Sequence, residues 1–260
     1  MADVIEERRG RVMVLTMHDP ATRNALGLEI FLKAADALHR AAHDPDVGAV
    51  VLTGSDGAFC SGGNLKNLAA LNGQDPATTR QAVEHLHTWT RMMRDCPKPV
   101  IAAVEGVAAG AGFSIALACD LIVSAAEARF VLAYIKVGLS PDGGATAFLS
   151  QVMPRHLATQ IALEGDTLTA ERLHALGVVN AVVPPGTALD AAVERAARLA
   201  AGPQAAQASV KKLLEDAYAG HLHAQLDREA DAFTHNLHSP DCAEGVRAFF
   251  EKRPPRFHGV

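Results

Sequence analysis

The sequence predicts an α/β fold, and three observations lead to this prediction. Short apolar runs typical of buried strands, such as Val47–Gly54, alternate with segments whose apolar residues recur at helical spacing. Glycine-rich turns twice join such a strand to a helix within the first two hundred residues. From about Leu189 the strand signal disappears and helical patterns follow. We therefore expect an α/β core over residues 1–200 and a helical region over residues 201–260.

The first elements lie near the amino terminus. Residues Arg11–Met17 alternate and predict a strand, which the Asp19-Pro20 turn ends. A helical pattern over residues 26–44 ends before Pro45, and the continuous apolar run that follows predicts a strand buried on both faces.

The same order then recurs. A strand pattern at residues 98–106 leads through a glycine-rich turn into a helix of small residues that ends near Asp120. Residues 121–134 predict two further short strands. In the helical region we expect helices over residues 188–202, 205–238 and 241–253, separated by Gly202-Pro203 and Ser239-Pro240.

Composition narrows the classes of function. The 260 residues carry 24 Lys and Arg against 29 Asp and Glu and contain no dense basic run, so nucleic acid is not expected as a partner. The four cysteines are scattered without metal-ligand spacing, so we expect no metal site and a reduced, cytoplasmic location. No apolar segment reaches the roughly 20 residues of a membrane span, and we expect neither a membrane anchor nor a secretion signal.

Two glycine-rich turns are the first candidates for a binding site. Residues 54–68 and 105–120 each end a buried strand with glycines and then start a helix. The first N–H groups of a helix have no acceptor within it, so two such turns facing each other could bind an anionic oxygen. For either turn alone, tight packing of a helix on a sheet is the simpler interpretation. Neither turn has the spacing of a dinucleotide-binding fingerprint.

Six motifs extend in order over nearly the whole chain. They are PATRNAL, FCSGGNL, KPVIAAVEGVAAGAGFSIALACDLIV, VGLSPDGGAT, LHALGVVNAVV and EGVRAFFEKRPPRF. On these motifs the sequence resembles the enoyl-CoA hydratase/isomerase (crotonase) superfamily. The resemblance implies the crotonase fold, a spiral of repeated ββα units with a helical C-terminal trimerisation region. It also implies an acyl-CoA substrate, no metal or redox cofactor beyond the coenzyme A of that substrate, and a homotrimer or a dimer of trimers.

Within this superfamily the motifs are most similar to one branch. It is the group of the phenylacetyl-CoA-type isomerase, often named oxepin-CoA hydrolase, alternative type. This similarity points toward the catabolism of aromatic acids.

The resemblance also assigns the groups that would hold the substrate. In this family two backbone N–H groups stabilise the enolate oxygen, and by motif these are the N–H groups of Gly63 and Ala111. The contacts to coenzyme A map to Arg23, Asn24, Ala25, Ser61 and Lys66, with Phe249 and Lys252 reaching the coenzyme A of a neighbouring subunit. For an exposed Lys or Arg alone, a solvated surface charge would be the simpler interpretation.

Three positions depart from the pattern of the family's hydratases, which use two glutamates to activate water. Here Ser114 stands at the first glutamate position and Tyr134 at the second, so hydration by the two-glutamate route is not expected. Asp142 stands where typical hydratases have glycine and where related isomerases and a dehalogenase have aspartate. Asp142 also fits a turn residue or the N-cap of the following helix. With the motif around it, we favour Asp142 as the catalytic base.

His87 is the second catalytic candidate, because its spacing from Pro99 matches the catalytic histidine of the dehalogenase. An exposed helix histidine is an equally good interpretation. His85, two residues earlier, is expected on a different side of the helix. Trp89 and Tyr134 are candidates for shaping an acyl pocket suited to a ring, although aromatic residues more often belong to the core.

Four functions remain open at this point. We favour double-bond migration in an acyl-CoA, with Asp142 moving one proton and His87 or Tyr134 assisting. Hydration by Asp142 and His87 is the first alternative. Attack of Asp142 on an aromatic ring is the second, which Tyr134 weakens because the dehalogenase has tryptophan there. A non-catalytic binder of coenzyme A or RNA is a different class, and the acidic balance weakens RNA.

Overall fold

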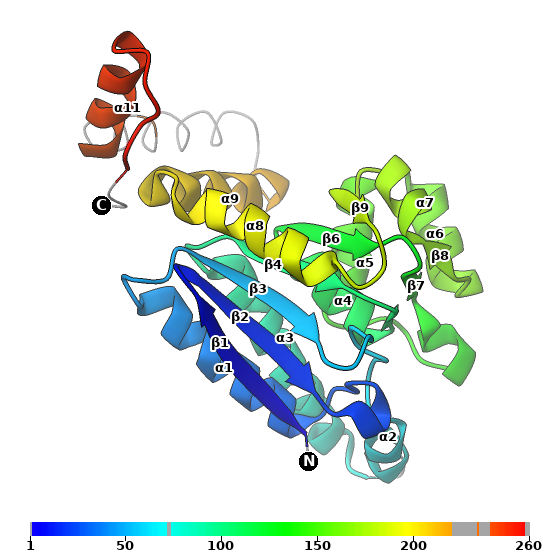
Figure 1. Ribbon diagram of the computed structural model, residues 1–260. Helices are drawn as coiled ribbons and strands as arrows, with labels where there is room; N and C mark the ends of the chain where they lie inside the picture. Colours follow the sequence, from blue (N-terminus) through cyan, green and yellow to red (C-terminus); the bar gives the residue numbers. More distant parts are fainter. Residues whose placement is uncertain (1, 72–73, 220–232, 234–239, 258–260) are drawn as a thin grey trace.

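The fold is built on a six-stranded sheet (Figure 1). The computed structural model describes residues 2–71, 74–219, 233 and 240–257. The strands lie in the order β1 (Asp3–Arg9), β2 (Val12–His18), β3 (Ala49–Gly54), β4 (Val100–Val104), β6 (Leu121–Ala125) and β9 (Ala181–Val183). β1 and β2 form an antiparallel hairpin, and every later neighbour pairs in parallel. A second sheet contains β5 (Val107–Ala109), β7 (Arg129–Val131) and β8 (Leu168–Thr169).

Helices cover both faces of the larger sheet, because its central strands are apolar on both sides. α1 (Leu28–His43) and α3 (Pro76–Asp95) belong to the core on one face, and α8 (Ala188–Ala200) packs on the other (Figure 1). A Cβ atom on Gly48 would lie 2.7 Å from the Cβ atom of Ala200. The end of α8 therefore approaches the start of β3 so closely that a side chain at position 48 would not fit.

The remaining helical elements are η1 (Pro20–Thr22), α2 (Leu65–Leu71), α4 (Ala111–Ala118), η2 (Ala133–Val137), α5 (Ala145–Val152), α6 (Arg155–Glu164), α7 (Ala170–Ala175), α9 (Gln204–Ala219) and α11 (Pro240–Phe250). α4 is buried on every side. Its sequence AGFSIALA is small and mostly apolar, so the helix can pass through the interior directly after β5.

Two ion pairs join α9 to the core. Lys211 Nζ lies 2.5 Å from Asp120 Oδ2, and Arg94 Nη2 lies 2.6 Å from Glu215 Oε2. Asp120 Oδ2 also accepts the N–H of Val100 at 2.7 Å, so the first pair links α9 to the start of β4. α11 projects away from the two sheets in Figure 1.

The predicted α/β fold is confirmed. β1 is an additional strand at the edge of the sheet, where its charged side chains face outward and mask the strand pattern. The helix predicted over residues 205–238 corresponds to α9 as far as Ala219, and its remainder lies outside the described residues, apart from residue 233. The division at residue 200 stays a prediction. Among the described helices, none is long and apolar enough to cross a membrane.

Candidate active site

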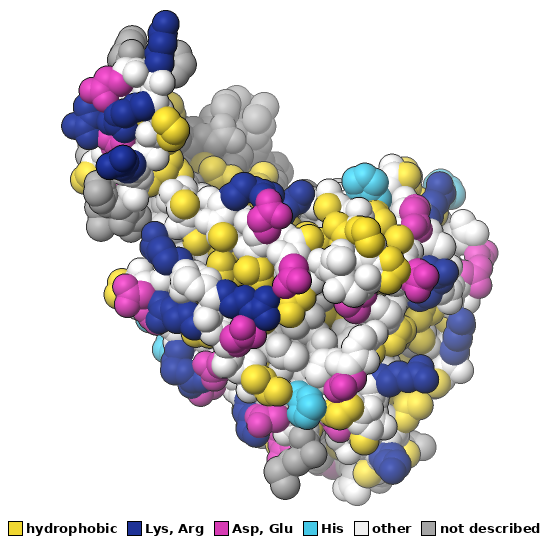
Figure 2. All heavy atoms as spheres, in the orientation of Figure 1, with side chains coloured by type: hydrophobic (Ala, Val, Ile, Leu, Met, Phe, Trp, Pro, Cys, Tyr) yellow, Lys and Arg dark blue, Asp and Glu magenta, His cyan; other side chains and the backbone are white. Residues whose placement is uncertain are grey.

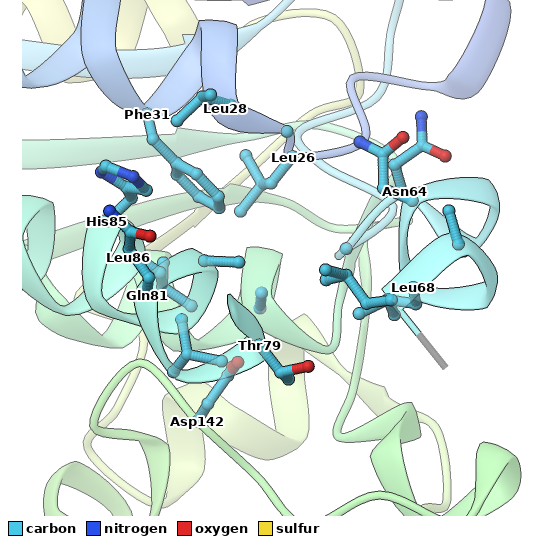
Figure 3. A pocket seen from close by; sticks show the side chains of 18 of the residues that line it. Leu26, Leu28, Phe31, Asn64, Leu68, Thr79, Gln81, His85, Leu86 and Asp142 are labelled. Carbon is cyan, nitrogen blue, oxygen red and sulfur yellow. The ribbon is translucent and has the colours of Figure 1, made fainter. Parts of the chain in front are cut away.

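A cavity of about 600 Å³ lies between the start of α1, the loop after β3, and helices α2 and α3 (Figure 3). Apolar side chains, among them Leu26 and Phe31, form much of its wall. Gly63, Ala111 and Asp142 also line it. The structure therefore brings together the two predicted N–H donors and the predicted base.

The first donor is exposed to the cavity by the way its turn pairs with the chain before α1. Leu26 donates its N–H to Gly62 O at 2.7 Å, and Asn64 donates its N–H to Leu26 O at 3.0 Å. This parallel bridge uses the neighbours of Gly63 on both sides and leaves the Gly63 N–H free. Within the described part of the chain, that N–H has no hydrogen-bond acceptor.

The second donor is the N–H of Ala111, the first residue of α4. A helix cannot satisfy its own first N–H groups, and the described residues offer Ala111 no acceptor. A Cβ atom on Gly62 would lie 2.7 Å from Ala109 O and 3.7 Å from Ala111 N. The two glycine turns therefore pack directly on each other, which is possible because Gly62 has no side chain.

Asp142 reaches the cavity through a turn with two left-handed glycines. Gly143 has φ 62° and Gly144 has φ 85°, conformations that glycine adopts readily. The N-cap of α5 is Gly144, and the Asp142 side chain does not cap that helix. The turn interpretation of Asp142 is thus correct for the backbone, while the carboxylate points to the cavity (Figure 3).

Tyr134 fixes the Asp142 carboxylate. Its hydroxyl donates to Asp142 Oδ1 at 2.6 Å, and Ser114 Oγ lies 2.9 Å from the same hydroxyl. Burial, and then the charge of Asp142, raise the pKa of Tyr134 far above its ordinary value, so the hydroxyl keeps its proton. Because Tyr134 gives that proton to the carboxylate, its oxygen accepts from Ser114.

Tyr134 does not line the cavity, and only 8% of its surface is exposed. It therefore contacts Asp142 from behind the wall of the cavity. Trp89 is buried behind the wall as well, with its ring centroid 6.4 Å from that of Phe31. Neither Trp89 nor Tyr134 lines the cavity. They contact residues that do, Trp89 through Phe31 and Tyr134 through Asp142.

The structure places His87 outside the cavity lining. Its Nδ1 lies 3.8 Å from Glu84 Oε2, and 34% of its side chain is exposed. His85 lies on the other side of α3, as predicted, and lines the cavity. The helix is therefore rotated so that the histidine we did not favour faces the substrate site.

Three of the predicted coenzyme A contacts make hydrogen bonds within the loop before α1 or to it. Asn24 is fully buried, and its side chain accepts from Asp19 N at 2.9 Å and donates to Ala58 O at 2.7 Å. Ser61 Oγ donates to Thr22 O at 2.7 Å. The Asn24 side chain therefore has no free surface for a ligand, and a contact of this residue with coenzyme A stays a prediction.

Ala25 is also part of this loop, since it is buried and its N–H donates to Thr22 Oγ1 at 3.1 Å. Arg23, with φ 55°, and Lys66, on α2, are exposed and carry no ion pair with another described residue. Both remain available to phosphate groups.

The C-terminal contacts lie far from the cavity. Lys252 is exposed after α11, and the Phe249 side chain lies outside the described atoms. Figure 1 shows α11 and α2 at opposite ends of the molecule, and Figure 2 shows Lys and Arg side chains gathered on the projection that α11 forms. Within one subunit, this segment does not reach the site.

Sequence reasoning missed the polar residues that α3 presents to the cavity. Thr78, Gln81 and His85 line it at intervals of three and four residues. These residues and the buried Trp89 follow one another at intervals of three and four residues. This spacing is the signal that could have found them, because residues three or four apart share a helix face.

Known proteins resemble this chain along its whole length. The family model described as enoyl-CoA hydratase/isomerase matches residues 7–260. The chain is 34% identical to the 2,3-dehydroadipyl-CoA hydratase of Escherichia coli (strain K12), over 100% of both chains. It is 36% identical to the 1,2-epoxyphenylacetyl-CoA isomerase of the same strain, over 95% of both chains. The crystal structure of an enoyl-CoA hydratase from Polaromonas sp. JS666 matches with a TM-score of 0.96 at 45% identity, covering 98% of this chain and 99% of that one.

Proposed function

Because the chain belongs to the enoyl-CoA hydratase/isomerase family of acyl-CoA enzymes, we propose that it moves a double bond within the acyl group, using Asp142 as its single base. One observation carries this proposal. Asp142 supplies the one carboxylate among the described residues that line the cavity. Addition of water calls for one group to deprotonate the water and another to deliver a proton, whereas migration of a double bond can use one carboxylate twice.

The reaction begins with the thioester oxygen accepting the N–H groups of Gly63 and Ala111. Asp142 removes a proton from the α-carbon of a 3-enoyl thioester, so that a C–H bond breaks and an O–H bond forms on the carboxylate. The electron pair moves to the thioester oxygen as a dienolate, where the two N–H groups stabilise the developing charge. The proton then returns to the γ-carbon and the electron pair leaves the oxygen, which gives a 2-enoyl thioester.

Tyr134 and Ser114 support this use of Asp142. The Tyr134 hydroxyl occupies Oδ1, which leaves Oδ2 as the oxygen that exchanges protons with the substrate. Because Tyr134 cannot rotate away from the buried Ser114 without losing a second hydrogen bond, the carboxylate is held in one orientation.

Product analysis in isotopically labelled water tests the proposal. A 3-enoyl-CoA incubated with the protein in D₂O should yield the 2-enoyl-CoA with deuterium at the γ-carbon, since the carboxylic acid can exchange its proton before returning it. A parallel incubation in H₂¹⁸O should yield no labelled hydroxyacyl product. Formation of an ¹⁸O-labelled hydroxyacyl-CoA as the main product would contradict the isomerase assignment.

Hydration is the second candidate, because the 34% identical relative and the Polaromonas structure are both named hydratases. In that reaction Asp142 would deprotonate the water, and the same ¹⁸O experiment identifies it. Attack of Asp142 on an aromatic ring would instead leave a covalent adduct on the protein, visible by intact-mass spectrometry. A protein that only binds coenzyme A would give neither product nor adduct.

We further infer a trimer or a dimer of trimers in which Lys252 and Phe249 approach the coenzyme A of a neighbouring subunit. The support is their position, since α11 projects away from the cavity of its own subunit (Figure 1). Light scattering should give the mass of three or six chains, and a stable monomer would contradict this assembly. The cytoplasmic location stays a prediction.

A further inference from the structure

The walls of the cavity differ in character. On the α3 side, Thr78, Gln81 and His85 form a polar stripe along the helix, beside the apolar Ala82, Val83 and Leu86. On the α1 side, Leu26 and Phe31 face the same space with apolar side chains (Figure 3). A purely hydrocarbon acyl chain would leave the polar stripe unmatched when it displaces water.

In Figure 3 His85 lies apart from Asp142, on the side of the cavity where Phe31 and Leu28 are drawn. Among the described residues that line the cavity, these two carry the titratable side chains. His85 has no hydrogen-bond partner in the described part of the chain. The cavity therefore presents an anionic group, Asp142, and a separate nitrogen donor, His85.

We propose that His85 selects acyl groups that end in a carboxylate. An imidazole has at least one N–H donor in every protonation state, and a hydrogen bond to a carboxylate is stronger than one to a neutral acceptor. The negative charge of Asp142 repels a second carboxylate and directs the end of the acyl group toward His85. Leu26 and Phe31 then cover the carbon atoms between the two ends. This inference rests on the proposed acyl-CoA function and adds the class of acyl group.

Two thioesters of equal length provide the test. One is a six-carbon 3-enoyl-CoA that ends in a methyl group, and the other is its six-carbon counterpart that ends in a carboxylate. The native protein should turn over the carboxylate-ended thioester with the higher kcat/KM. His85→Leu should lower kcat/KM for that thioester by roughly 10- to 100-fold, the range for a hydrogen bond to a charged group, and should leave the methyl-ended thioester within about threefold.

The chain offers a matched control. His87→Leu removes the same kind of side chain from the same helix, but His87 lies outside the cavity, so the ratio of the two substrates should stay unchanged. His85→Gln keeps an N–H donor and should retain part of the preference. An equal loss for both thioesters in His85→Leu, or the same change of ratio in His87→Leu, would overturn the proposal.

Binding measurements separate this inference from the proposed reaction. In an Asp142→Asn background, calorimetry can compare the dissociation constants of the two thioesters with and without His85→Leu. If the double-bond proposal fails, no isomerised product forms but the His85-dependent difference in affinity persists. If the His85 proposal fails, the two thioesters bind equally in both variants, whatever reaction is catalysed.

Discussion

The proposed role of Asp142 depends on four nearby residues that act in different ways. Gly143 and Gly144 give the turn its left-handed backbone, so that the carboxylate leaves the α5 N-terminus and enters the cavity. Tyr134 then occupies one carboxylate oxygen and keeps its own proton, because burial and the nearby negative charge both raise its pKa. Ser114 donates a hydrogen bond to the oxygen of the Tyr134 hydroxyl.

Replacing Asp142 by asparagine is expected to remove the base while preserving the size of the side chain and an acceptor for Tyr134. Turnover of the 3-enoyl thioester should fall by roughly 10²- to 10⁴-fold, the usual contribution of a general base. Product formation followed by chromatography measures the loss, and unchanged unfolding in denaturant shows that the fold is intact. Unchanged turnover would mean that another group moves the proton.

Tyr134→Phe keeps the ring but removes the hydrogen bond to Asp142. Without this donor the carboxylate is no longer held in one orientation, so kcat should fall while KM changes little. The expected fall in kcat is roughly tenfold, in line with a hydrogen bond to a charged group, and steady-state kinetics measure it.

Ser114→Ala should lower kcat by a smaller factor, since Ser114 acts through Tyr134. An unchanged kcat in Tyr134→Phe would contradict the role of its hydroxyl in orienting Asp142.

At the scale of elements, the site depends on two strand-to-helix turns that pack on each other. The parallel bridge between Leu26 and Gly63 holds the first turn, and the start of α4 forms the second. Gly62 lies between them with φ 100°, in contact distance of the second turn. The geometry of the two N–H donors is thus set by backbone packing.

Gly62→Ala is expected to disturb both turns. The added Cβ atom would lie 2.7 Å from Ala109 O on a residue with φ 100°, so the free energy of unfolding should fall by roughly 1–3 kcal/mol. Gly63→Ala is the matched control, because its Cβ atom would lie 3.5 Å from Leu68 Cδ1, an ordinary contact. Denaturant titration of the two variants measures the difference, and equal losses would contradict the packing argument.

The folded conformation of α11 is expected to become less stable at acidic pH. Hydrogen bonds from Arg253 and Arg247, and from the N–H of Arg256, hold the pKa of Glu244 well below its ordinary value of 4.5. A depressed pKa means that the ionised carboxylate stabilises the folded segment above pH 4.5, and that this stabilisation is lost as the pH falls below that value. Hydrogen exchange of the α11 amides should therefore become faster, relative to their intrinsic exchange rates, as the pH is lowered from 5.

Glu244→Gln should remove that pH dependence. It should also give faster exchange already at pH 7, because the arginine partners lose their charged acceptor. Exchange in the native protein that follows intrinsic rates down to low pH would contradict a role for Glu244.

At the scale of the whole molecule, the sheet separates two apolar cores. One core, between the sheet and α1 and α3, also supports the cavity, and the other is closed by the alanine face of α8. Ion pairs connect α9 to Asp120, next to the sheet, and to Arg94 on α3. The helical region is therefore connected to the core by charge as well as by apolar packing.

Lys211→Met should destabilise the protein by roughly 1–3 kcal/mol, since it leaves the mostly buried Asp120 with fewer partners. Its neighbour offers a matched control. Lys212 pairs with Asp216 on the surface, with 68% of its side chain exposed, so Lys212→Met should change stability by less than about 0.5 kcal/mol. Thermal unfolding of both variants gives the comparison, and equal effects would show that the Lys211 pair contributes no more than a surface pair.

Sequence patterns predicted the strands well where all neighbours are apolar, as in β3, because burial on both faces leaves no other assignment. The family resemblance pointed to Gly63 and Ala111, which both line the cavity, and their role as donors stays a prediction. The sequence favoured His87 over His85, because a count of residues from Pro99 does not fix the rotation of a helix. The burial of the Asn24 side chain could not be predicted for a similar reason, since only tertiary packing selects its φ of 59°.

In the proposed site, main-chain groups bind the substrate and side chains move protons, and this separation has an evolutionary consequence. The groups proposed to hold the thioester are backbone N–H groups of Gly63 and Ala111, so mutations of exposed side chains leave them in place. The groups proposed to move protons or to orient the base are the side chains of Ser114, Tyr134 and Asp142, which can be exchanged without rebuilding a turn. A lineage can therefore acquire a new reaction on the same activated carbonyl through a few substitutions, while selection for the fold and for thioester binding continues unchanged.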